Sequence, residues 1–184
     1  MTTGYHIKNP ADAYYLTFGA VDWVDVFTRK IYRDIIIDSF TFCRINKGLK
    51  VWAYVIMSNH IHCILSALHN NLSDILRDFK RHTGSTILKC IQNEPESRRD
   101  WMLKRFEFAA RSNVRNSPHQ FWQHDNHAEV LITTKFTVQK LNYIHLNPVR
   151  AGLVENAGDW LYSSARNYLN LHAIMEVDLM DINY

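Results

Sequence analysis

Hydrophobic positions alternate with polar ones in some segments of the 184-residue chain and recur at helical spacing in others. The points where one pattern gives way to the other mark the boundaries of the predicted elements. Aromatic and β-branched residues at alternating positions predict strands over residues 13–21, 50–57 and 61–66. The second and third strands form a hairpin, because only "SNH" connects them. Helical spacing predicts helices over residues 29–46, 71–92, 101–112 and 134–147. Residues 120–132 hold at least one more strand, and Pro148 stops the last helix.

The order β-α-β-β-α, an insertion, β and a final helix is typical of the split βαβ, or ferredoxin-like, pattern. The predicted class is therefore α+β, with one antiparallel sheet, helices on one face and the other face free for a site. In the first helix we expect an apolar stripe to be buried, formed by Ile31, Ile35, Phe42 and Ile45. In the second the stripe is Leu72, Ile75, Leu76 and Phe79; Asp74, Arg77, Lys80 and Arg81 point away from it, and Gly84 could interrupt the helix.

Composition places the chain among globular proteins, with 47% hydrophobic and 21% charged residues. Its length suits a single domain over 1–184, with a core at about 13–155 and a C-terminal extension at about 156–184. No apolar run approaches the roughly 20 residues that cross a bilayer, so we expect no membrane partner. We see no secretory signal, and three scattered cysteines predict free thiols in a cytoplasmic protein: Cys43, Cys63 and Cys90.

The net charge is only +3, but basic side chains outnumber acidic ones between residues 71 and 115. A basic middle on a near-neutral chain is either a phosphate-facing surface or an ordinary solvated helix face. Charge alone leaves both interpretations open.

The stretch "NHIHCIL", residues 59–65, places two histidines in surroundings suited to a protein core. On a strand, His60 and His62 project from the same face, while Ile61 points into the helix-covered core. Two neutral imidazoles can form half of a divalent-metal site. This spacing also occurs by chance, so a metal site needs a third ligand from elsewhere.

A candidate for that ligand lies in "QKLNYIHLNPVRAGLV", residues 139–154. Tyr143 and Asn147 are four residues apart on a helix and share a face. An amide oxygen suits a hard cation such as Mg²⁺ or Mn²⁺, and an activated phenol could attack a phosphate that the metal polarises. In the alternative interpretation, Tyr143 is an aromatic residue at the edge of the core and Asn147 fixes the turn before Pro148.

Several blocks of the sequence resemble one known family. "MSNHIHCIL" resembles the HUH motif (His, bulky hydrophobe, His) of the single-tyrosine transposases, although Ser58 stands where many relatives have Pro. "FWQHDNHAEVLI", "QKLNYIHLNPVRAGLV" and "WLYSSARNY" resemble later blocks of the REP-associated tyrosine transposases. The blocks occur in order from about residue 13 to residue 169, so the resemblance covers most of the chain.

The resemblance implies an HUH endonuclease fold with an added C-terminal helix that carries the tyrosine. Such enzymes cleave and rejoin single-stranded DNA next to a hairpin, through a 5′-phosphotyrosine intermediate and a free 3′-hydroxyl. Carried to this chain, Tyr143 is the nucleophile, and His60, His62 and Asn147 bind a divalent metal, Mg²⁺ or Mn²⁺. Related transposases often have Gln at the position of Asn147.

The implied partner is single-stranded DNA with a hairpin such as a REP-like palindrome, bound in the nucleoid. Phosphate contacts are expected from the basic helix and from the end of the tyrosine helix, through Arg77, Lys80, Arg81, His82 and Arg150. A homodimer is one option, because mobile single-tyrosine enzymes generally work as dimers while REP-associated ones need not.

Other aromatic residues and histidines are assigned structural roles. Trp122 could stack on unpaired bases, but we expect it in the core. His145 should face away from Tyr143 on the helix. One of His124 and His127 could approach the site, but we expect each of them to lie outside it.

Two alternatives to a tyrosine nuclease stay open. One is a non-catalytic regulator that binds hairpin DNA and descends from a transposase. The other is a structural zinc site at the histidine pair, which the lack of a nearby cysteine disfavours.

Overall fold

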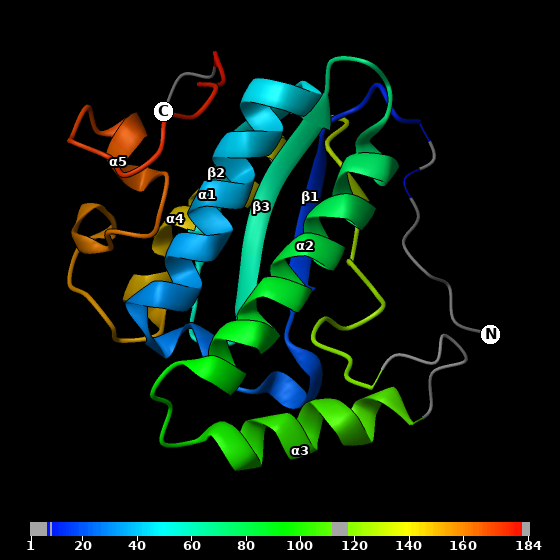
Figure 1. Cartoon of the computed structure of the whole chain (residues 1–184). Coiled ribbons are helices and arrows are strands. Elements are labelled where there is room, and N and C mark those ends of the chain that lie inside the picture. The colour runs from blue at the N-terminus through cyan, green and yellow to red at the C-terminus, as the bar shows by residue number, and fades with distance from the viewer. Residues whose placement is uncertain (1–6, 8, 112–117, 182–184) are drawn as a thin grey trace.

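A four-stranded antiparallel sheet forms the centre of the molecule (Figure 1), with the strand order β2-β3-β1-β4. The computed structural model describes residues 7, 9–111 and 118–181. The strands are β1 (Tyr14–Gly19), β2 (Leu49–Ile56), β3 (His60–Ala67) and β4 (Glu129–Val130). The predicted ferredoxin-like α+β arrangement is confirmed, including the tight hairpin between β2 and β3.

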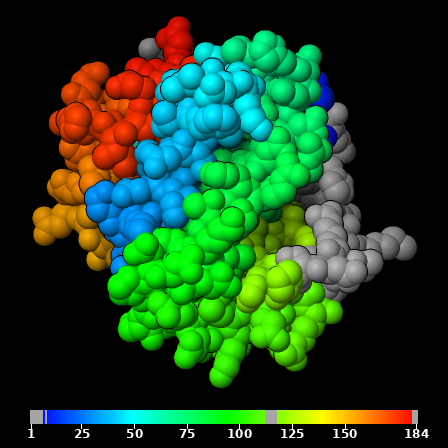
Figure 2. Space-filling view, viewed as in Figure 1, coloured from blue at the N-terminus to red at the C-terminus, as the bar shows by residue number. Residues whose placement is uncertain are grey.

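The helices of the described residues keep the predicted order. They are α1 (Lys30–Lys47), α2 (Leu72–Asn93), α3 (Arg99–Ala110), α4 (Thr134–Arg150) and α5 (Ala165–Tyr168), with short 3₁₀ turns η1 (Val21–Trp23), η2 (Val26–Thr28) and η3 (Ala157–Asp159). Helices α1 and α2 run along one face of the sheet, and α3 lies across one end of it (Figure 1). In the space-filling view these three helices form the central part of the visible surface, and the C-terminal segment, coloured orange to red, lies beside α1 (Figure 2).

The main core lies between the sheet and α1 and α2. Alternate residues of the central strands point into it, among them Phe18, Ile61 and Cys63, none of which is exposed. The intervening residues of the same strands, including Thr17 and His62, point to the other face. The sequence pattern of β3 therefore assigned its two faces correctly.

That second face is partly covered, which corrects the expectation that it is free. Leu141 and Ile144 of α4 are fully buried against Tyr15, Val55 and Ile64 of the sheet. The tyrosine-bearing helix has an apolar stripe of its own, and this stripe needs a surface to pack on. As a result, α4 brings its polar side next to the histidines.

The buried stripe of α1 differs from the predicted one. Ile31, Phe42 and Ile45 are exposed, Ile45 by 76%. The residues that pack into the core are Tyr32, Ile36, Phe40 and Cys43. This helix carries apolar residues on more than one face, and the face with two large aromatic rings buries more area.

Helix α2 buries the predicted stripe and continues through Gly84. A Cβ atom at Gly84 would lie only 3.3 Å from Cβ of Phe121, so the glycine allows close packing rather than a break. Phe121 and Trp122 pack against this point of the helix.

Helix α4 extends to Arg150, so the predicted stop at Pro148 is wrong. Pro148 lies in the last turn, where it removes one backbone hydrogen bond without breaking a longer run. The amides of Ala151 and Leu153 donate to the carbonyls of Asn147 and Pro148, and Gly152 ends the helix with a φ of 69°.

The last predicted strand is confirmed but short. Only Glu129–Val130 pairs with β1 in regular geometry. The segment before it runs beside β1 through single hydrogen bonds, from the Gln123 amide to Gly19 and from the Thr17 amide to Asn126.

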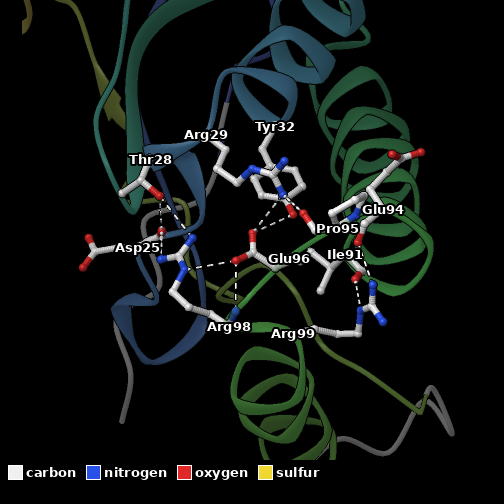
Figure 3. Close-up of polar contacts among 10 residues, drawn as sticks. All are labelled: Asp25, Thr28, Arg29, Tyr32, Ile91, Glu94, Pro95, Glu96, Arg98 and Arg99. Atoms are coloured by element: carbon white, nitrogen blue, oxygen red, sulfur yellow. Dashed lines mark hydrogen bonds and ion pairs between the residues drawn. The ribbon is translucent and has the colours of Figure 1, made fainter.

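A buried carboxylate joins the start of α3 to α1 (Figure 3). The Glu96 side chain is 2% exposed; it accepts a hydrogen bond from the Tyr32 hydroxyl at 3.0 Å and pairs with Arg29 and Arg98. Burial acts to raise the pKa of Glu96, but hydrogen bonds from Arg98 and Tyr32 outweigh it and hold the pKa below its usual value.

Two smaller predictions concern the cysteines and the membrane. Cys43, Cys63 and Cys90 are free thiols, as expected, and the first two are buried. Among the described helices, none combines the length and apolar character needed to cross a bilayer. The division into a core and a C-terminal extension stays a prediction.

Candidate active site

The two histidines lie at the start of β3 on the face opposite the main core. Their ring centroids are 4.6 Å apart, and Ile61 between them is buried on the other side. His62 is 6% exposed and His60 is half-buried. The predicted projection of both imidazoles from one face is therefore what the structure shows.

Each imidazole is oriented through its Nδ1 atom. His60 Nδ1 lies 2.6 Å from Oδ1 of Asn59, and His62 Nδ1 lies 2.8 Å from the Tyr15 hydroxyl and 2.9 Å from Oγ1 of Thr17. An amide oxygen only accepts, so His60 donates from Nδ1 and keeps a lone pair on Nε2. Hydroxyl partners allow the same tautomer at His62. Metal-binding histidines are commonly oriented in this way.

Both imidazoles are held in the neutral form. Burial lowers the pKa of His62 to about 3, and the nearby His60 and Lys140 act in the same direction. Burial also lowers the pKa of His60. Neutral imidazole is the form that binds metal ions, so the pair needs no deprotonation at neutral pH.

Tyr143 on α4 lies directly beside this pair. Its ring centroid is 5.2 Å from that of His62 and 6.2 Å from that of Tyr15, and its side chain is 37% exposed. Tyr143 and His62 line one cavity of about 510 Å³, together with Tyr15, Thr17, His127, Glu129, Phe136, Gln139, Lys140 and Arg150. The structure thus joins the two sequence motifs in one site.

Two cations from α4 flank the tyrosine. The Arg150 guanidinium lies 5.6 Å from the centroid of the Tyr143 ring, and within the described part of the chain it has no other partner. Lys140 Nζ is paired with Glu129 at 2.7 Å and lies 4.1 Å above the Tyr15 ring. Arg150 is therefore the unpaired positive charge at this cavity.

The structure brings Asn147 less clearly into the site. It is half-buried one turn after Tyr143, its side chain forms no hydrogen bond among the described residues, and it does not line the cavity. Its role as a metal ligand stays a prediction. No group of three His, Cys, Asp or Glu side chains in the described ranges could hold a metal ion, so a third protein ligand would be of another type.

The basic residues of α2 lie across the sheet from Tyr143. Arg77, Arg81 and His82 are exposed on the helix-covered side. Arg77 is paired with Asp74 at 2.6 Å, and Arg81 is paired with Asp78. Any contact of these residues with DNA would be separate from the tyrosine site.

Lys80 does not point away into solvent as expected. Its ammonium group donates to the carbonyl of Gln123 at 2.6 Å and to Oδ1 of Asn126 at 2.7 Å. Burial lowers the pKa of Lys80 to about 8. The lysine therefore fixes the segment that runs beside β1 and leads to His127 and Glu129 at the cavity.

Replacing Lys80 by Met is expected to lower the free energy of unfolding by about 1–3 kcal/mol, because two partly buried oxygen acceptors lose their donor. Urea unfolding followed by circular dichroism measures the change. Lys89→Met is the matched control, because Lys89 is exposed on the same helix and its loss should change stability by less than about 0.5 kcal/mol. Equal stabilities of the two variants would contradict the anchoring role.

Two of the structural assignments from sequence hold. Trp122 is 6% exposed, and its indole N–H donates to Oγ1 of Thr83 at 3.0 Å. His145 is 4% exposed, with Nε2 2.9 Å from Oγ of Ser164.

Sequence reasoning missed several site residues. His127 was not expected at the site but lines the cavity. Tyr15, Thr17 and Lys140 were not singled out. Tyr15 and Thr17 are two residues apart on β1 and therefore share a face of the sheet, and Lys140 lies one turn before Tyr143 on the same face of α4. The periods of strand and helix could therefore have placed all three on the faces that form the site.

Comparison with known proteins gives a likeness of fold. No family model and no curated protein matches the chain. A solved REP-associated tyrosine transposase bound to a REP hairpin is similar with a TM-score of 0.61 and 18% identity, covering 100% of this chain and 96% of that one. At this identity the likeness establishes that the chain has the fold of that transposase, and the resemblance inferred from sequence is matched by the fold.

Two further structures are less similar. A protein of Deinococcus radiodurans R1, described as a transposase, has a TM-score of 0.44 and 15% identity, covering 78% of this chain and 95% of that one. A bacterial tRNA(His) guanylyltransferase-like protein in complex with GTP has a TM-score of 0.40 and 12% identity, covering 79% of this chain and 68% of that one.

Proposed function

We propose that the chain is a transposase-like DNA-binding enzyme that cleaves and rejoins single-stranded DNA next to a hairpin. The observation that carries the proposal is the placement of the Tyr143 ring 5.2 Å from the His62 ring, in one cavity. His62 lines this cavity with Tyr143, and the His60 ring lies next to it, with its centroid 4.6 Å from that of His62. The likeness in fold to a transposase bound to a REP hairpin supports the same class of substrate.

The histidine pair fits a divalent metal, Mg²⁺ or Mn²⁺. Nδ1 of each ring contacts side-chain oxygen atoms of the protein, so the Nε2 atoms of His60 and His62 are the ones that would bind the ion. We propose the Asn147 amide oxygen as the third ligand. A bound ion would supply a Lewis acid for a non-bridging oxygen of the DNA phosphate.

The chain's own residues then account for the chemistry. The Tyr143 oxygen forms a bond to phosphorus as the phenol loses its proton. The P–O3′ bond breaks, and the 3′ oxygen takes up a proton and leaves as a hydroxyl. Arg150 contacts the phosphate oxygens and offsets their charge. Rejoining is the reverse step, with a 3′-hydroxyl attacking the phosphotyrosine.

The hairpin stem needs a separate surface. The exposed residues Arg77, Arg81 and His82 of α2 are the candidates for phosphate contacts there, although acidic neighbours pair with the two arginines. Lys80 is not among them, because it binds the segment beside β1.

Covalent trapping tests the proposal directly. The protein is incubated with Mn²⁺ and a pool of hairpin oligonucleotides that carry randomised single-stranded flanks, and is then denatured. We expect an adduct that survives denaturation, that maps to Tyr143 by mass spectrometry, and that does not form when a chelator is present. The absence of any adduct with Mg²⁺ or Mn²⁺ would overturn the assignment as a nuclease.

One observation favours the alternative, a regulator that binds hairpin DNA without cutting it. Asn147 does not line the cavity of Tyr143, so the set of three proposed ligands is not assembled around that cavity. Hairpin binding that is insensitive to a chelator, together with no adduct, would establish this function instead.

A further inference from the structure

Trp23 is presented to solvent by an unusual backbone. Asp22 and Trp23 both have positive φ, 51° and 53°, a left-handed conformation that non-glycine residues rarely adopt in succession. The neighbouring Val21 and Val24 are buried, whereas Trp23 is 53% exposed. Backbone strain of this kind is maintained where the surrounding structure holds it and tends to occur at functional sites.

A chain of contacts fixes Trp23 relative to the histidines. The Asn59 side-chain amide donates to the carbonyl of Trp23 at 3.2 Å, while Oδ1 of the same residue accepts from His60. The Trp23 ring centroid is 5.8 Å from that of His60, in an edge-to-face arrangement. Together with the His60–His62 and His62–Tyr143 contacts, this makes a row of four adjacent rings that ends at the proposed nucleophile.

A surface hollow of about 680 Å³ opens beside Trp23. It is also lined by Phe108, which is 66% exposed, by His124, and by Arg111, whose guanidinium lies 5.9 Å from the Phe108 ring and is paired with Glu107 at 2.9 Å. Exposed aromatic faces combined with positive charge are the features with which proteins bind unpaired nucleic-acid strands, because bases stack on rings and cations contact phosphates.

We infer that the Trp23 indole is the stacking platform for an unpaired base of the single-stranded DNA that leads to Tyr143. Phe108 and Arg111 extend this binding site away from the histidines. The inference rests on the proposed function for its substrate class, and it adds a binding site for the strand beside the hairpin.

Binding measurements in the presence of a chelator test the inference without catalysis. Two probes are compared: a hairpin with a single-stranded extension, and the same hairpin without the extension. The extended hairpin is taken from the covalently trapped pool, or from the bound fraction of that pool if no adduct forms. We expect Trp23→Ala to weaken binding of the extended hairpin by about 10-fold to 100-fold and to leave the bare hairpin unchanged. Trp23→Phe should keep most of the affinity, and Trp101→Ala, which removes another exposed tryptophan on α3, should change neither.

Abasic substitution along the extension identifies the stacked base. At one position the abasic site should weaken binding to wild type as much as Trp23→Ala does, and combining the two should cause no further loss. Equal loss on both DNAs, or additive losses at every position, would overturn the inference. Wild-type protein that binds the bare stem as tightly as the extended DNA would overturn it too. Trp23-dependent binding of the extension without any adduct would instead contradict the nuclease and leave the inference standing.

Discussion

Tyr143→Phe is expected to eliminate the covalent protein–DNA adduct while leaving the fold and DNA binding intact. The substitution removes only the phenolic oxygen, which is the atom that would bond to phosphorus. The Tyr143 side chain is 37% exposed, and its hydroxyl makes no hydrogen bond within the described ranges. Stability should therefore change by less than about 0.5 kcal/mol.

The adduct assay is run on both proteins after circular dichroism has shown equal unfolding midpoints. Tyr15→Phe is the matched control, because Tyr15 lies in the same cavity and its hydroxyl lies 2.8 Å from His62 Nδ1. This control should reduce the rate of adduct formation without abolishing it, since Thr17 still orients the imidazole. An adduct that persists in Tyr143→Phe means that another residue is the nucleophile.

The sheet and the orientation of its histidines were predictable because strand period assigns faces without tertiary information. Neighbouring residues of β3 point to opposite faces of the sheet: Ile61 is buried, and His60 and His62 project from the other face. The tyrosine was predictable from its motif. Its position beside His62 was expected only through the resemblance, because local sequence does not determine how α4 packs against Tyr15 and Ile64.

Helix faces were less predictable where more than one face is apolar. In α1, Ile31 and Phe42 stand at helical spacing, yet Tyr32 and Phe40 are the residues buried. Hydrophobicity alone does not choose between two such stripes, because the choice depends on the shape of the sheet beneath. By contrast, α2 has one apolar stripe and was assigned correctly.

Polar residues of the site are hardest to infer from one sequence. Lys80 belongs to a basic helix, but its ammonium group is directed by oxygen atoms of Gln123 and Asn126, more than forty residues away. Tyr15 and Thr17 become important only because β1 pairs with β3, where Thr17 is opposite His62. Such roles follow from strand pairing rather than from local pattern.

His62→Gln is expected to lower the affinity for Mn²⁺ by more than about 100-fold and to abolish adduct formation. Loss of a partner that merely orients a ligand weakens metal binding by about 10-fold to 100-fold, and loss of the ligand itself should exceed this. Glutamine can keep a hydrogen bond to Tyr15 or Thr17 but offers no imidazole nitrogen. Calorimetric titration of the folded variant with Mn²⁺ measures the effect.

The chain supplies a matched control in His145→Gln. Both histidines are buried, and burial lowers the pKa of His145 to about 4, so each is neutral at pH 7. His145, however, contacts Ser164 rather than the cavity. Its replacement should lower the free energy of unfolding by about 1–3 kcal/mol and leave Mn²⁺ affinity unchanged. If the two variants lose the same affinity, the effect comes from damage to the fold. If His62→Gln binds Mn²⁺ as well as wild type, the ion is held elsewhere and the proposed role of the histidine pair is wrong.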